Sequence, residues 1–140
     1  MFHPNLTLEL LNSMAKGNML EHLGIEFTEF GSDYMKAKMP VDHRTTQPLN
    51  MLHGGASVAL AETLGSMASN FCVDHSVQYC VGLEINANHI CSAMPGEFVL
   101  GTAKAIHIGK RTHVWEIRIT NEKDKLVSLC RITNMVLDKK

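Results

Sequence analysis

The stretch His53–Phe71, HGGASVALAETLGSMASNF, decides the fold of this chain of 140 residues. It consists almost entirely of small or apolar residues, and Glu62 is the one charged residue in it. A helix that is apolar on nearly every face is typical of a buried helix rather than a surface helix. We therefore predict a long central helix over residues 53–71.

The segments on either side of this helix have the period of β-strands. Upstream, apolar and polar residues alternate over 25–41, and Gly31-Ser32-Asp33 interrupts the alternation, which predicts a β-hairpin. A short amphipathic helix over 6–15 precedes it. Four downstream segments have strand character, at 77–87, 98–106, 112–120 and 126–137. This order predicts an α+β fold, in which a curled antiparallel sheet wraps round one central helix.

Composition indicates a single globular domain. The chain is 45% hydrophobic and 19% charged, and a domain of this size buries about two-thirds of its unfolded surface. No repeat, low-complexity tract or linker divides it, so we predict one domain over residues 1–140. Thirteen Lys and Arg residues against fourteen Asp and Glu residues give a formal net charge of −1. A balance of this kind gives no general attraction for nucleic acid or an anionic membrane.

The four cysteines, Cys72, Cys80, Cys91 and Cys130, have neither C-x-x-C nor zinc-finger spacing. We interpret them as reduced core thiols of a cytoplasmic protein. No cationic segment precedes the first apolar stretch and no run of about 18 apolar residues occurs, so we expect neither export nor a membrane span. The eight histidines lack the pairwise spacing of zinc ligands, so we predict no metal site.

Glu62 is the residue with the strongest chemical indication. A carboxylate in the middle of a nearly apolar helix either lies on an exposed stripe of that helix or is buried and needs compensation. A buried, unpaired carboxyl is harder to ionise than one in water, which suits a base that works near neutral pH. Composition leaves both alternatives open, and the neighbouring residues favour the second.

His53-Gly54-Gly55 stands where a loop over 42–51 leads into the helix. The first N–H groups of a helix have no intrahelical partner and can hold an anion or a developing oxyanion. Paired glycines let another group approach this backbone, although they also serve as a plain flexible helix entry. Helical side chains lean toward the N-terminus, so we expect Glu62 to point back toward these amides, with Ser66 on the same face.

The segment His107-Ile108-Gly109-Lys110-Arg111 is predicted to form a basic turn between two strands. Four cations between Lys104 and Arg118 stand against Glu116 alone. Lys and Arg side chains together with turn amides can grip a phosphate. An ordinary solvated hairpin end explains the same residues equally well.

Three segments together, LHGGASVALAETLGSMAS (52–69), VGLEINANHI (81–90) and HIGKR (107–111), resemble the hotdog-fold acyl-CoA thioesterases. The resemblance is closest to the subgroup of the enterobactin proofreading thioesterase and the 1,4-dihydroxy-2-naphthoyl-CoA hydrolase, which is related to one class of 4-hydroxybenzoyl-CoA thioesterase. It implies hydrolysis of acyl- or aroyl-CoA to a carboxylic acid and CoA, with neither cofactor nor metal. It also implies a homo-oligomer, typically a dimer of dimers, with active sites at the dimer interface.

The resemblance also implies roles for individual residues. Glu62 matches the catalytic carboxylate, which is either a nucleophile that forms a mixed anhydride or a general base on water. Gly54 matches the glycine whose amide polarises the thioester carbonyl, with His53 beside it. Gln47 matches a glutamine that helps to place the carbonyl or water, and Ser66 a polar residue across the pocket. The substrate and CoA contacts that it implies are Gly82, His89, Ile90, Cys91, Ser92, Ile106, His107, Ile108, Gly109, Lys110 and Arg111.

Two other functions stay open because a fold does not fix a function. A hotdog-fold acyl-thioester dehydratase would pair His53 or His89 with a carboxylate and would release no free thiol. A non-catalytic acyl-CoA binding module would bind CoA esters equally well with Glu or Ala at position 62. Cys91 lies where the family leads us to expect a more polar or basic residue, so the acyl preference is left open.

Overall fold

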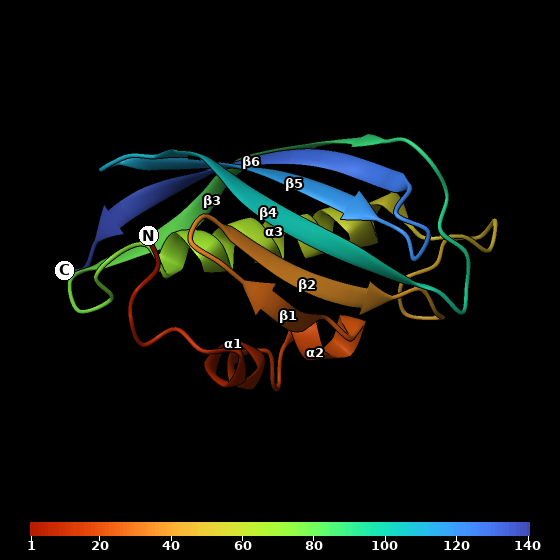
Figure 1. The fold of residues 1–140 in the computed structure, drawn as a ribbon, viewed down its shortest axis with the longest axis horizontal. Helices are drawn as coiled ribbons and strands as arrows, with labels where there is room; N and C mark the ends of the chain where they lie inside the picture. The colour runs from red at the N-terminus through yellow and green to blue at the C-terminus, as the bar shows by residue number, and fades with distance from the viewer.

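The computed structural model describes residues 1–140 and shows a six-stranded antiparallel sheet that curls round one long helix (Figure 1). The elements are α1 (Leu8–Met14), α2 (Met19–Leu23), β1 (Glu26–Phe30), β2 (Tyr34–Pro40), α3 (Gly54–Asn70), β3 (Gln78–His89), β4 (Phe98–Ile108), β5 (Thr112–Thr120) and β6 (Leu126–Asp138). The strands lie side by side in the order β1-β2-β4-β5-β6-β3. The α+β prediction of a curled antiparallel sheet round one central helix is confirmed. None of the helices combines the length and the apolar character that a membrane span requires.

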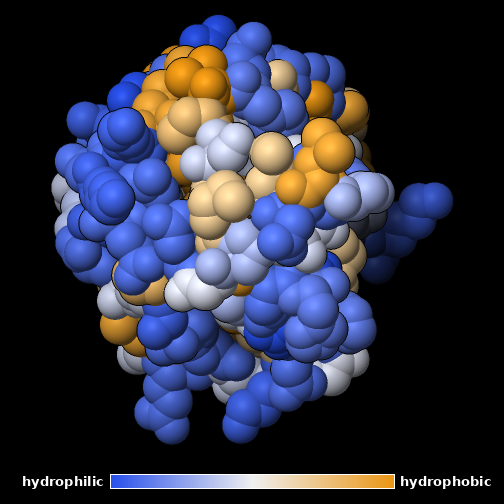
Figure 2. All heavy atoms as spheres, turned by 90° about the vertical axis from the view of Figure 1, so that its right-hand side faces the viewer, coloured by the Kyte–Doolittle hydropathy of each residue, from blue (hydrophilic) through white to orange (hydrophobic).

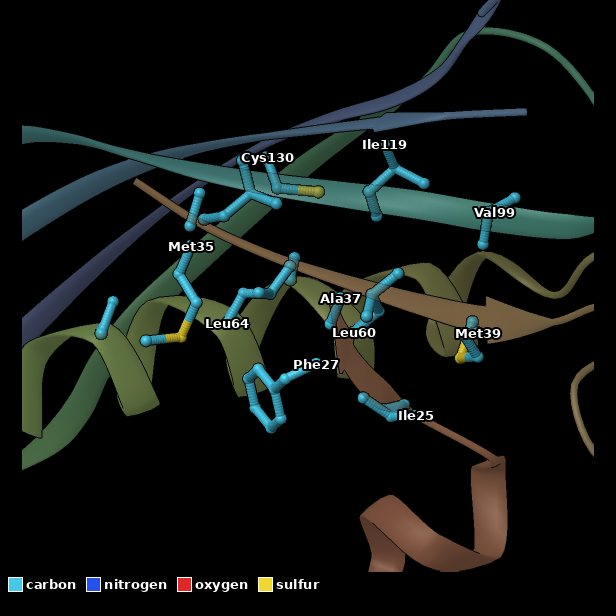
Figure 3. Packing of buried hydrophobic residues seen from close by; sticks show 14 of the residues in the cluster. Ile25, Phe27, Met35, Ala37, Met39, Leu60, Leu64, Val99, Ile119 and Cys130 are labelled. Carbon is cyan, nitrogen blue, oxygen red and sulfur yellow. The ribbon is translucent and has the colours of Figure 1, made fainter. Parts of the chain in front are cut away.

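The hydrophobic core fills the space between α3 and the concave face of the sheet (Figure 3). Leu60 and Leu64 are fully buried on the inner face of α3 and pack against side chains of the hairpin β1–β2. Gly65 lets the sheet approach this helix, because a Cβ atom there would collide with Ile132 of β6. The prediction that α3 is buried therefore holds for one face only, since Glu62 on its opposite face is exposed.

All four cysteines are free thiols. Cys80 and Cys130 are buried, and burial raises the pKa of the Cys72 and Cys80 thiols to about 11. These three thiols are protonated and unreactive at neutral pH. Cys91 is exposed instead, so the prediction that every cysteine is a core residue is wrong for Cys91. Its position explains the difference, because it follows the end of β3 in the connection to β4.

Helix α2 is an element that the sequence analysis missed. It has only five residues, which is too short for a helical period to stand out. Asn18 caps its N-terminus by accepting a hydrogen bond from the Leu20 N–H (3.0 Å), and Gly24 ends it in the left-handed conformation with φ of 70°. Two signals in the sequence could have indicated it: Asn18 is a typical N-cap residue, and Gly24 is a typical residue at a helix C-terminus.

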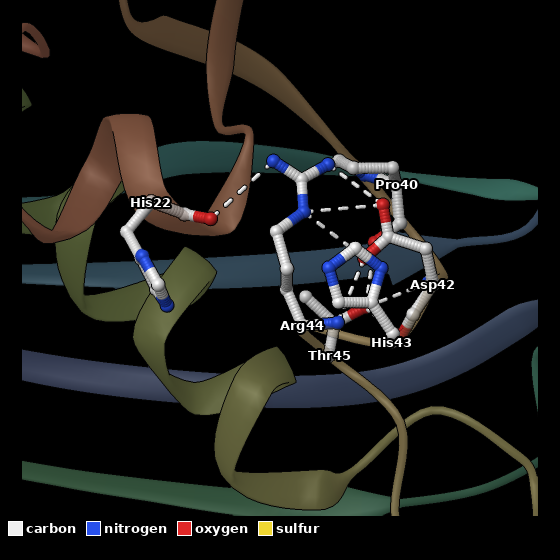
Figure 4. Close-up of polar contacts among 6 residues, drawn as sticks. All are labelled: His22, Pro40, Asp42, His43, Arg44 and Thr45. Atoms are coloured by element: carbon white, nitrogen blue, oxygen red, sulfur yellow. Dashed lines mark hydrogen bonds and ion pairs between the residues drawn. The ribbon is translucent and has the colours of Figure 1, made fainter.

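A cluster of polar contacts anchors α2 to the loop after β2 (Figure 4). The Arg44 guanidinium donates to the backbone carbonyl of His22 in α2 (3.3 Å) and to the Asp42 carboxylate (2.6 Å from Nη2 to Oδ2). This guanidinium and the Arg44 N–H lower the pKa of Asp42 to about 2. The Arg44 hydrogen bond to His22 thus joins α2 to the loop that holds Gln47, and the ion pair with Asp42 holds the Arg44 side chain in place for it.

We expect Asp42→Asn to lower the free energy of unfolding by about 1 kcal/mol at neutral pH, the upper range for a partly exposed ion pair. The folded-state pKa of Asp42 lies below its ordinary value of 3.8. The stabilisation is therefore fully present above about pH 4 and is lost as the pH falls toward 2. Urea denaturation at pH 7, 4 and 3 measures it, with Asp124→Asn as the control for an exposed carboxylate without an ion pair. A difference between variant and wild type that stays constant down to pH 3 contradicts this assignment.

Candidate active site

Glu62 lies on the exposed face of α3, close to β3. A Cβ atom added to Gly82 of β3 would lie only 2.8 Å from Glu62 Oε1. The missing side chain at Gly82 therefore makes the room that the carboxylate occupies. The sequence analysis favoured a buried carboxyl, but Glu62 is exposed in the single chain. The physical reason is that Glu62 lies outside the fully buried face of α3, which carries Leu60 and Leu64.

A mainly apolar pocket with a volume of about 310 Å³ opens beside Glu62, between α2 and α3. Its lining residues are Met19, Leu20, Leu23, Ile25, Gly55, Val58, Ala59, Glu62 and Thr63. Glu62 is the charged residue among them. A pocket of this kind can bind an apolar group of a ligand and hold it next to the reactive carboxylate. The α2 side of this pocket was missed from the sequence because α2 itself was missed.

The N-terminus of α3 presents one free amide. The Gly55 N–H donates to Nδ1 of His53, the N-cap residue (2.7 Å). The Gly54 N–H, the first of the helix, has no hydrogen-bond partner in the chain. A Cβ atom at Gly54 would lie 2.7 Å from Nε2 of His89, and Nδ1 of that ring is 3.3 Å from the Ser128 hydroxyl. Of the two glycine amides, only that of Gly54 is therefore available to an acceptor.

Within one chain, Glu62 and the Gly54 amide do not converge. Glu62 comes eight residues after Gly54, which corresponds to about 12 Å along α3. Along β3, Glu62 lies against Gly82 and Gly54 lies against His89, seven strand residues or roughly 23 Å apart. The expectation that Glu62 points back to the amides of its own helix is wrong, because its carboxylate lies against β3.

The other residues that the resemblance implies fall into two groups. Gln47 lies in a loop closed by the Thr46–Leu52 bridge, where its side-chain oxygen accepts from the Leu49 N–H. This loop and the connection after β3 gather at the end where α3 begins (Figure 1). The group at this end is Gln47, His53, Gly54, His89, Ile90, Cys91 and Ser92. That end is mostly hydrophilic, with separate apolar patches (Figure 2).

The second group lies further along β3 with Glu62. The register pairs Gly82 with Asn134 of β6, and Asn134 with His113 of β5, next to the β4–β5 turn. Lys110 and Arg111 in this turn are exposed and form no ion pair. The members of this group are Glu62, Ser66, Gly82, Ile106, His107, Ile108, Gly109, Lys110 and Arg111. No three His, Cys, Asp or Glu side chains gather where they could hold a metal ion.

Comparison with known proteins identifies relatives along nearly the whole chain. The family described as the Thioesterase superfamily matches residues 49–128. The 1,4-dihydroxy-2-naphthoyl-CoA hydrolase of Escherichia coli strain K12 is 50% identical over 132 residues, 94% of this chain and 96% of that protein. The proofreading thioesterase EntH of Cronobacter turicensis is 44% identical over 133 residues, 95% of this chain and 96% of that protein.

Solved structures give the same result. A mutant thioesterase from Pseudomonas aeruginosa matches with a TM-score of 0.95 and 47% identity, covering 99% of each chain. A thioesterase from Haemophilus influenzae matches with a TM-score of 0.93 and 44% identity, covering 98% of this chain and 94% of that one. The fold together with these relatives places the chain among the hotdog-fold thioesterases. The chain belongs to the Thioesterase superfamily, and it is an enzyme.

Proposed function

We propose that this protein hydrolyses acyl- or aroyl-CoA thioesters to a carboxylic acid and CoA. The observation that carries the proposal is the Glu62 carboxylate, which lies against Gly82 at the rim of an apolar pocket of about 310 Å³. Relatives named as a naphthoyl-CoA hydrolase and a proofreading thioesterase support the same substrate class. The acyl group enters the pocket between α2 and α3, and its carbonyl carbon lies beside Glu62.

In the proposed reaction, Glu62 acts on a carbonyl that is already a reactive acyl donor. The carboxylate either attacks the thioester carbon and forms a mixed anhydride, or takes a proton from the water that attacks it. The free Gly54 N–H donates to the carbonyl oxygen as negative charge develops there. The C–S bond breaks, and CoA takes up a proton and leaves as the thiol; in the nucleophilic route water then hydrolyses the mixed anhydride, which releases the carboxylic acid and restores Glu62. A positioned carboxylate and one backbone donor supply this chemistry without a Ser-His-Asp triad.

We propose that two copies of the chain build each active site. Within one chain, Glu62 and Gly54 lie about 12 Å apart along α3. A two-fold axis perpendicular to α3 that crosses it midway between them, near Val58, reverses the helix direction and so places Gly54 of each copy opposite Glu62 of the other. The corresponding midpoint on β3, between Gly82 and His89, falls near Ile85.

The free edge of β3 supports this dimer. β3 has twelve residues and ends the sheet, so its outer backbone groups have no strand partner. Apolar side chains remain exposed along it, including Val81 (38%) and Leu83 (53%). Long apolar edge strands are normally covered or paired. We propose that the two β3 strands pair with one another and that such dimers associate further into a tetramer.

The remaining residues then line the path of the substrate. Lys110 and Arg111 in the β4–β5 turn hold CoA phosphates, next to Ile106, His107 and Ile108 at the end of β4 and to Gly109, since both cations are exposed and without an ion pair. Gln47 and Ser66 place the carbonyl or the water on either side. His53 contributes by capping α3, which leaves the Gly54 N–H as the donor. The substrate contacts further include Gly82, His89, Ile90, Cys91 and Ser92.

The proposed function predicts free-thiol release from CoA esters. A panel of a short acyl-CoA, a long acyl-CoA, benzoyl-CoA and a dihydroxynaphthoyl-CoA is incubated with the protein, and thiol is followed with a colour reagent. We expect at least one ester to be hydrolysed, and the best substrate identifies the acyl class that the pocket accepts. Binding without thiol release from any ester contradicts the proposal, and double-bond formation in the acyl chain with the thioester intact indicates a dehydratase.

A further inference from the structure

Asn134 of β6 is a fully buried amide whose orientation is fixed by its partners. Its Nδ2 donates to the Gly65 carbonyl (3.0 Å) and to the Ser69 hydroxyl (2.8 Å), both on α3. A backbone carbonyl can only accept, so the amide nitrogen must face Gly65. The Ser69 hydroxyl also accepts from the Trp115 indole N–H (2.8 Å). This network determines that the Asn134 oxygen, Oδ1, points away from it.

That oxygen is a buried acceptor with no donor. It faces Gly82, the cross-strand partner of Asn134, and would lie 3.7 Å from a Cβ atom there. Glu62 Oε1 lies 2.8 Å from the same point. Both oxygens thus face the space left by the missing side chain of Gly82. A buried acceptor without a donor costs stability, and two acceptors facing one space repel each other unless a hydrogen comes between them.

We propose that Asn134 is a positioning residue that accepts a hydrogen bond from the Glu62 carboxyl once Glu62 has taken up the catalytic proton. The inference rests on the proposed function and assigns Glu62 the part of general base. Water loses a proton to Glu62 as its oxygen bonds to the thioester carbon. The C–S bond then breaks, and Glu62 returns the proton to the thiolate sulfur. Asn134 stabilises the intermediate stage, in which Glu62 is neutral.

Among the side chains around the space at Gly82, Glu62 is the charged one. The α2 side chains that face Glu62, Met19, Leu20 and Leu23, are apolar. On β3, Glu84 pairs with Thr133 and so projects from the opposite face of the sheet to Asn134.

Two titratable groups beside Asn134 are shifted toward their neutral forms. His113, its partner on β5, is buried, and burial lowers its pKa. Cys80 on β3 is a thiol, because burial raises its pKa to about 11. No neighbouring cation therefore competes with the Asn134 oxygen for the carboxyl of Glu62.

The test compares pH–rate profiles of thiol release for wild type and for Asn134→Val, which removes the acceptor. The acidic limb of kcat/KM reports the ionisation of the essential base in the free enzyme. Without the acceptor the protonated base is less stable, so we expect the limb to move to lower pH by about 0.5–1 unit. At the plateau we expect kcat to fall about threefold to tenfold, the effect of one hydrogen bond, with KM nearly unchanged.

Two further variants separate this role from a structural one. Trp115→Phe removes a hydrogen bond to the same Ser69 hydroxyl but does not face Gly82, so we expect its acidic limb to coincide with that of wild type. Asn134→Thr is shorter but stays polar, and it carries the test if the Val variant does not fold, with a shift in the same direction. The proposal is overturned if the acidic limb of kcat/KM in the Asn134 variants coincides with that of wild type or moves to higher pH. Full activity of Glu62→Gln would instead refute the proposed function itself.

Discussion

Replacing Glu62 by Gln is expected to lower kcat for thioester hydrolysis at least a hundredfold, a loss of about 2.7 kcal/mol or more of transition-state stabilisation. Gln has the size of Glu but can neither attack a carbonyl nor take a proton from water. Because Glu62 is exposed in the chain and forms no ion pair, we expect KM and Tm to change little. Thiol release from the best CoA ester, with Tm from a thermal scan, measures both effects.

The matched control is Glu122→Gln, which removes an exposed carboxylate in the β5–β6 turn, far from the pocket. It is expected to retain wild-type kcat and KM. If Glu62→Gln keeps more than about a tenth of the wild-type kcat, Glu62 is neither nucleophile nor base. The pocket beside it would then serve binding alone.

Replacing Gly54 by Pro is expected to lower kcat about 10²- to 10³-fold, the usual effect of losing one oxyanion donor. Proline removes the backbone N–H, and at this position the helix itself does not use that N–H. The backbone accommodates proline because it is the first residue of α3, and His53 before it is extended with φ of −70° and ψ of 131°. The donor can therefore be deleted without breaking a hydrogen bond of the fold.

Gly54→Ala is the control for this substitution. Its Cβ atom meets the His89 ring as the proline would, so the ring must shift in both variants. Ala retains the N–H, however, and its kcat should exceed that of Gly54→Pro by at least tenfold. Equal activity of the two variants would mean that the loss comes from the displaced His89 ring and that the Gly54 amide is not a donor to the substrate.

Most of the helices and strands could be predicted from the sequence, because the spacing of apolar residues that favours each of them is a local feature of the chain. The predicted strand 112–120 coincides with β5, and the predicted helix 53–71 differs from α3 by one residue at each end. Arg131 interrupts an apolar strand, and no local pattern accounts for it; in the structure this exposed residue stands directly opposite Glu116 across β5 and β6. That pairing depends on the register between β5 and β6, which no local pattern contains.

The candidate site was predictable residue by residue but not as an arrangement. Glu62 and Gly54 stand out by their chemistry, yet the exposure of Glu62 depends on which face of α3 the sheet covers. The position of Asn134 behind Gly82 follows from the pairing of β3 with β6 across about fifty residues of sequence. Because of the strand register, the residues around Gly54 and those around Glu62 also lie at different positions along β3 in a single chain. That separation is the structural basis for proposing a site shared by two copies.

A complementation measurement tests this shared site most directly. Chains that carry Gly54→Pro are co-expressed with chains that carry Glu62→Gln, and the mixed oligomers are assayed for thiol release. In each mixed dimer one site combines the intact Glu62 of one copy with the intact Gly54 of the other. With random pairing in a two-fold dimer we expect about one quarter of wild-type activity, although each variant alone is nearly inactive. Mixed oligomers that are no more active than the two parents would contradict a site built from two chains.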